Sequence, residues 1–128
     1  MGMQHARYTR LYADAAGETH FTEVEQTLTP QDFAPPAPPL QIAALFPATR
    51  CGFVGAAVDW DGIIPHPAPR RQLFCTMQGT YEVTVSVGEV RRFPPGALLL
   101  LEDTTGKGHA TRIVSEEEVL IFSVALEG

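Results

Sequence analysis

The 128-residue sequence predicts an all-β fold, and three observations lead to this prediction. From about residue 50, short segments rich in Val, Leu, Ile, Phe and Thr are separated by Gly, Pro or acidic residues. In one of them, Tyr81, Val83 and Val85 alternate with polar residues, which is the period of a half-buried strand. Helical patterns are rare. Six or more strands at spacings of about ten residues predict a sandwich or a small barrel.

The N-terminal part of the sequence holds the single helical signal. In TPQDF, residues 29–33, Thr29 can cap a helix and Pro30 suits its first position. The prolines that begin at residue 35 end such a helix after about one turn.

A proline-rich stretch, FAPPAPPLQIAALFPA, follows at residues 33–48. Its five prolines favour an extended, polyproline-type path. Because apolar residues such as Leu40 and Phe46 follow at once, we expect an arm laid over the domain, in preference to a ligand for a proline-binding partner.

The remaining segments are predicted strands that build a single domain. Residues 1–49 are expected to form an N-terminal arm and edge strands packed on a barrel core of residues 50–128. The predicted strands of the core lie in residues 51–60, 71–79, 80–88, 96–103, 109–115 and 116–126.

Composition limits the classes of partner. The net charge is −6 with only nine Lys and Arg, which argues against nucleic acid as a partner. No apolar run approaches the roughly 18 residues that cross a bilayer, so no membrane contact is expected. The first residues lack the apolar core of a secretory signal, and we therefore expect a cytoplasmic location. Cys51 and Cys75 have no CxxC spacing and are interpreted as ordinary apolar residues.

Residues 62–79, GIIPHPAPRRQLFCTMQG, resemble the first motif of the cupin family, a glycine-bounded run with His-x-His and a glutamate. Counting back from Gly79 places Gln72 at the glutamate position and Ala68 at the second histidine position. His66 then occupies the first histidine position. The run HPAPRRQ also resembles a subset of small, single-domain cupins.

The second cupin motif is matched from Gly96 through the apolar strand to His109, with a turn that is two residues longer. An alternative frame from Gly88 fits the glycine and proline spacing but places Leu99 where histidine belongs, so we reject it. Ile113 replaces the motif's asparagine. The resemblance covers about half of the chain.

The resemblance implies a cupin-type double-stranded β-helix, or jelly-roll barrel, with an extended N-terminal Pro-rich arm. It also implies a homodimer and a divalent transition metal (Fe, Mn, Ni, Cu or Zn) held by His66, Gln72 and His109. The substitutions weaken that metal expectation, because Ala68 offers no donor atom and Gln72 offers a neutral oxygen in place of a charged one. The alternative is that each histidine has a structural role only.

Strand alternation adds Arg70 to this set. Residues 66, 68, 70 and 72 would share the interior face of a barrel strand, and an inward guanidinium needs a carboxylate from the protein or from a ligand. The alternative is a salt bridge within the protein. On the preceding strand, small residues such as Gly55 and Ala56 leave volume beneath Trp60 for a pocket.

The predicted function is therefore binding of a small, anionic molecule in an interior pocket. The pocket is expected to be lined by His66, Arg70, Gln72 and His109. A bound divalent metal and weak enzymatic activity are further expectations. Two alternatives remain open from the sequence. One is a sensing or binding module without turnover. The other is a dimeric assembly protein without metal.

Overall fold

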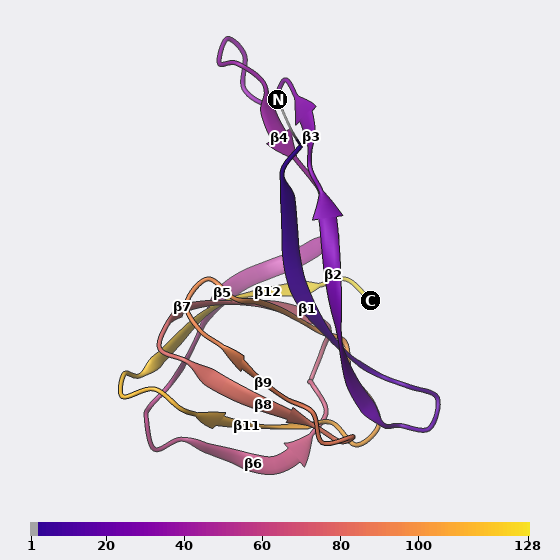
Figure 1. Ribbon diagram of the computed structural model, residues 1–128, viewed down its shortest axis with the longest axis vertical. Helices are drawn as coiled ribbons and strands as arrows, with labels where there is room; N and C mark the ends of the chain where they lie inside the picture. Colours follow the sequence, from indigo (N-terminus) through magenta and orange to yellow (C-terminus); the bar gives the residue numbers. More distant parts are fainter. Residues whose placement is uncertain (1–2) are drawn as a thin grey trace.

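The computed structural model describes residues 3–128, and every regular element in them is a β-strand, so the all-β prediction is confirmed (Figure 1). The strands are β1 (His5–Ala13), β2 (Thr19–Thr27), β3 (Thr29–Gln31), β4 (Leu40–Ile42), β5 (Ala48–Ala56), β6 (Asp61–His66), β7 (Gln72–Gln78), β8 (Tyr81–Val85), β9 (Val90–Phe93), β10 (Leu98–Leu101), β11 (His109–Ile113) and β12 (Val119–Leu126). No helix in this part of the chain is long and apolar enough to cross a bilayer.

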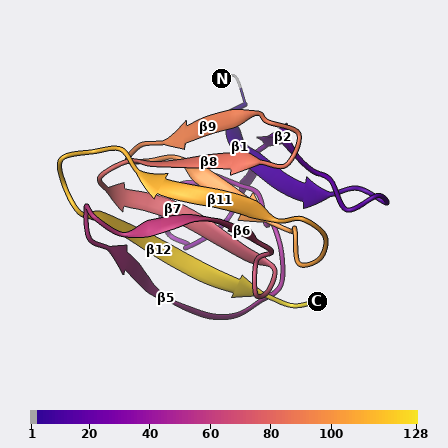
Figure 2. The same cartoon turned by 90° about the horizontal axis from the view of Figure 1, so that it is seen from below.

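Ten of these strands form two sheets. One sheet has six strands in the order β2-β1-β10-β7-β12-β5, and the other has four in the order β6-β11-β8-β9. Seen from below, β8 and β9 lie on one side of the molecule and β12 and β5 on the other (Figure 2). All pairs in the two sheets are antiparallel except β1 with β10, where Thr9 lies beside Leu99.

The main core lies between the sheets, where the inward residues of both meet. Leu11, Val83 and Leu99 are almost completely buried there, and full burial of such a side chain contributes about 1.5–3 kcal/mol. A second, smaller cluster lies on the outer face of the six-stranded sheet, where Tyr8 and Leu100 are covered by Phe46 and neighbouring apolar side chains.

The proline-rich segment takes a different course from the predicted one. β3 and β4 pair with each other through Thr29 and Ile42, so the predicted helical turn at residues 29–33 is wrong. Pro30 is tolerated because this two-stranded sheet is all edge. The hairpin projects beyond the two main sheets and does not lie over them, and its residues are largely exposed (Figure 1).

Candidate functional site

A cavity of about 230 Å³ opens between the two sheets. Most of its wall is aliphatic or aromatic, and polar side chains enter it at few positions. Its lining residues are Val54, Gly55, Ala56, Trp60, His66, Ala68, Pro69, Gln72, Phe74, Tyr81, Val83, Leu99, Leu101, His109, Thr111, Ile113, Val119 and Ile121.

The two predicted histidines meet at this cavity. His66 ends β6 and His109 begins β11, and the two are register partners across the antiparallel pair. Their ring centroids are 5.4 Å apart, and the rings are tilted by 43°. His109 is 8% exposed, whereas His66 is exposed, so the pair extends from the interior to the mouth of the cavity.

Both rings are oriented through Nδ1. The Nδ1 of His109 lies 2.6 Å from Oδ2 of Asp103, a residue without solvent exposure. The Nδ1 of His66 lies 3.1 Å from the carbonyl oxygen of Ile64. A carbonyl or carboxylate oxygen can only accept, so each neutral ring carries its proton on Nδ1 and keeps an Nε2 lone pair.

Gly108 allows the loop before β11 to approach β6 closely. Its φ is 73°, and a Cβ at this position would lie 2.1 Å from the carbonyl carbon of His66. No residue other than glycine fits a site with both features. The carbonyl oxygen of Gly108 also accepts a hydrogen bond of 2.7 Å from Thr19 Oγ1.

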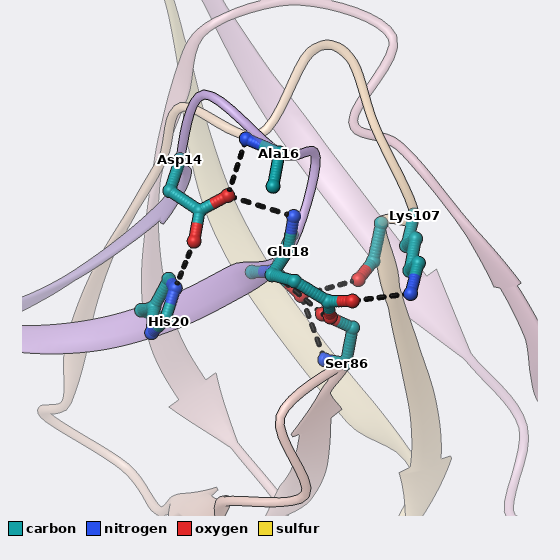
Figure 3. A network of polar contacts seen from close by, with 8 residues as sticks. Asp14, Ala16, Glu18, His20, Ser86 and Lys107 are labelled. Atoms are coloured by element: carbon teal, nitrogen blue, oxygen red, sulfur yellow. Dashed lines mark hydrogen bonds and ion pairs between the residues drawn. The ribbon is translucent and has the colours of Figure 1, made fainter.

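A polar network anchors this loop to the β1–β2 hairpin (Figure 3). Glu18 accepts a hydrogen bond from Ser86 Oγ at 2.6 Å and forms an ion pair with Lys107. These two contacts lower the pKa of Glu18, so the carboxylate stays charged. Asp14 Oδ1 accepts from the backbone amides of Ala16 and Glu18 at 2.9 and 3.0 Å and shapes the hairpin turn.

Three buried side-chain oxygens in this region lack a hydrogen bond of good geometry. They are the hydroxyls of Tyr81 and Thr76 and Oδ1 of Asp103, all closed to solvent in the described part of the chain. The Thr76 hydroxyl lies beside that of Tyr81 and acts to lower its pKa, but burial has the larger effect. Burial raises the pKa of Tyr81, so its hydroxyl stays protonated and can donate. Tyr81 also lines the cavity, where it stacks on Phe93 with ring centroids 5.2 Å apart.

Small residues leave space for the cavity beside Trp60, as the sequence predicted. Gly55 and Ala56 line the cavity together with Trp60, which confirms the expected free volume beside that ring. Gly62 makes room for Trp60, because a Cβ there would lie 2.2 Å from the indole ring.

The divalent metal that the cupin resemblance implies needs several donor side chains around one point. The two imidazole Nε2 atoms are suitable ligands, and Gln72 lines the same cavity. Ala68 has no donor, and the carboxylate of Asp103 is turned to His109 Nδ1. Within residues 3–128 no three His, Cys, Asp or Glu side chains are grouped to hold an ion. The residues therefore do not fit the usual site of three charged or imidazole ligands.

Arg70 is not brought to the cavity with the other three predicted site residues. It is exposed and lines a separate hollow of about 130 Å³, which shares Gln72 with the cavity. Arg71 turns away to bind Glu102, which Arg10 also contacts. Burial raises the pKa of Glu102, but the hydrogen bonds from the two arginines outweigh this effect and lower it.

One of three comparisons with known proteins finds a similar protein. No family model matches it, and no curated protein is significantly similar in sequence. Among solved structures, the cupin domain of Cnp3 from Schizosaccharomyces pombe superposes with a TM-score of 0.50 at 14% sequence identity. The match covers 98% of this chain and 84% of that chain. The chain therefore has a cupin-type, jelly-roll fold, as the motifs predicted.

Proposed function

We propose that this cupin-type barrel binds a small molecule that has a largely apolar body and a hydrogen-bond donor at one end. One observation carries the proposal: two imidazoles with free Nε2 atoms face one end of an otherwise apolar cavity. Binding sites of this kind combine an apolar wall with a few placed polar groups. The cavity volume of about 230 Å³ favours a ligand smaller than a drug-sized molecule.

The proposed role is binding without turnover. The residues that line the cavity include no carboxylate, amine or thiol that would act as a nucleophile beside the imidazoles. This favours the sensing or binding module, one of the two alternatives left open by the sequence, over the weak enzymatic activity of the first interpretation.

A ligand screen tests the proposal. Small uncharged alcohols, amides and phenols are screened by thermal shift and by Trp60 fluorescence, since Trp60 is the single tryptophan and lines the cavity. His109→Ala and His66→Ala should weaken a hit, whereas His5→Ala, whose ring contacts Thr27 far from the cavity, should not. A hit that binds equally well to all three variants would refute the site.

Elemental analysis of untagged protein separates this proposal from the metal-dependent enzyme. We expect well under one transition metal per chain. One metal per chain, lost in both histidine variants, would overturn the present proposal in favour of the metal site expected from the motifs.

A second proposal concerns assembly, because the outer face of the six-stranded sheet carries an apolar patch. Phe53 is 68% exposed and meets Phe122, its register partner on that face, edge-on at 5.8 Å. β5 is also the edge of that sheet. We propose that a second copy of the chain covers this patch, because a two-fold contact would set the same apolar patch and the same β5 edge of both copies against each other.

A further inference from the structure

The basic residues of this chain divide into two groups. Seven of the nine Lys and Arg side chains form ion pairs with a carboxylate, and the remaining two, Arg50 and Arg70, form none within residues 3–128. The pairs are Arg7–Glu25, Arg10–Glu102, Arg71–Glu102, Arg91–Glu23, Arg92–Glu82, Lys107–Glu18 and Arg112–Glu82.

The two unpaired arginines line the same hollow of about 130 Å³. Arg50 on β5 and Gln72 on β7 are both register partners of Ala125 on β12, so the three side chains share one face of the sheet. Arg70 reaches the hollow from the loop before β7. No acidic residue lines the hollow, and the rest of its wall is Cys51, Gly52, Gln72, Ser123 and Ala125.

This arrangement is unusual for an acidic chain. The chain has a net charge of −6, so it has enough carboxylates to pair with every arginine. No carboxylate lines the hollow with Arg50 and Arg70. Two guanidinium groups on one small hollow repel each other unless an anion lies between them. Guanidinium forks bind carboxylate and phosphate oxygens in pairs, and the neighbouring Gln72 amide is a further donor.

We propose that the Arg50–Arg70 hollow is a binding site for an oxyanion, the carboxylate or phosphate group of a small molecule. The site goes beyond the cavity function and does not depend on it, because neither arginine lines the cavity. Gln72 is the common wall of both spaces, so an anionic group held by the arginines lies next to the cavity that the two histidines face.

Calorimetric titration at low ionic strength tests the site, with inorganic phosphate and malonate as separate probes. The double variant Arg50→Gln, Arg70→Gln should bind the preferred anion about tenfold or more weakly, the loss expected when charge-assisted hydrogen bonds are removed. Arg7→Gln, an exposed but paired arginine outside the hollow, is the control and should bind as the wild type. Failure of both anions to bind the wild type, or equal weakening in the control, overturns the proposal.

His109→Ala separates this proposal from the cavity function. It should leave phosphate or malonate binding unchanged even where it removes binding of the cavity ligand. Loss of anion binding in His109→Ala would place the anion in the cavity and overturn the separate site.

Discussion

Asp103 holds the ring of His109 from the side away from the cavity, with its carboxylate oxygen 2.6 Å from Nδ1 and no exposure to solvent. The backbone oxygen of Asp103 also accepts a hydrogen bond of 2.9 Å from the amide of Ala68. One residue of the β10–β11 loop therefore fixes both the histidine and the first-motif segment opposite it.

Removing this carboxylate should destabilise the protein. Asp103→Ala leaves the buried Nδ1–H of His109 without a partner, which costs about 1–3 kcal/mol of unfolding free energy. Chemical denaturation measures the loss, and Glu25→Ala, which removes an exposed ion pair, should cost under about 1 kcal/mol. Nitrogen chemical shifts of His109 should also show a loss of the Nδ1–H tautomer. Equal stability of the two variants would contradict the role given to Asp103.

Gly108→Ala should destabilise far more than Gly88→Ala. Both glycines have positive φ, 73° and 95°, so both variants carry the strain of a left-handed alanine, about 1–2 kcal/mol. Only at position 108 does the new Cβ also meet the backbone of His66, because nothing lies within 4 Å of position 88. The difference in unfolding free energy between the two variants isolates this close approach. If the two variants lose the same stability, the loop does not approach β6 as described.

Tyr81→Phe should stabilise the fold or leave it unchanged. The buried hydroxyl of Tyr81 has only a poorly aligned neighbour, the Thr76 hydroxyl, so its removal also removes a desolvation cost of about 1–3 kcal/mol. We expect the same variant to weaken the binding of a cavity ligand that accepts a hydrogen bond from this hydroxyl. Thermal stability and binding affinity should therefore change in opposite directions. A clear loss of stability would show that the hydroxyl has a partner in the folded protein.

Acid should destabilise the protein through Glu102. Its pKa is lower in the folded state than in the unfolded state, so the carboxylate stabilises the fold above the ordinary pKa of 4.5. That contribution is lost as the pH falls through the folded-state pKa. Denaturation followed from pH 7 to pH 3 should give a shallower decline for Glu102→Gln than for the wild type. Parallel curves would mean that the Arg10 and Arg71 contacts do not carry the effect.

The outer patch predicts a dimer that a charge can break. Phe53→Glu should shift the mass measured by light scattering from dimer to monomer, because it places a carboxylate at the centre of the patch. Ile64→Glu, at an exposed position of β6 in the other sheet, is the matched control and should remain dimeric. A monomeric wild type at micromolar concentration would contradict the assembly proposal.

The sequence predicted β8, whose apolar residues alternate cleanly, and β12, an almost continuous apolar run that follows three glutamates. β6 was not predicted, because it has no alternation of apolar and polar residues. Ile63 and Ile64 are adjacent and both exposed, and Pro65 follows them. β2 was also hard to see, since only its first part, around Thr19 and Phe21, is buried in the barrel.

At the site, the two motifs paired His66 with His109, which are register partners at the end of β6 and the start of β11. Strand alternation predicted that Arg70 faces the interior, but Arg70 does not line the cavity. β7 begins only at Gln72, and because residues 67–71 are not a strand, their side chains need not alternate. Asp103 and Arg50 became candidates only through tertiary contacts that no local pattern encodes.

The parallel pairing of β1 with β10 has a consequence for how the chain is made. During synthesis on the ribosome, residues 5–13 emerge long before residues 98–101, so the first strand must wait for its neighbour while most of the barrel is translated. Because Thr19 also fastens the loop at Gly108, the surroundings of His109 are completed only when the earliest and late segments of the nascent chain join.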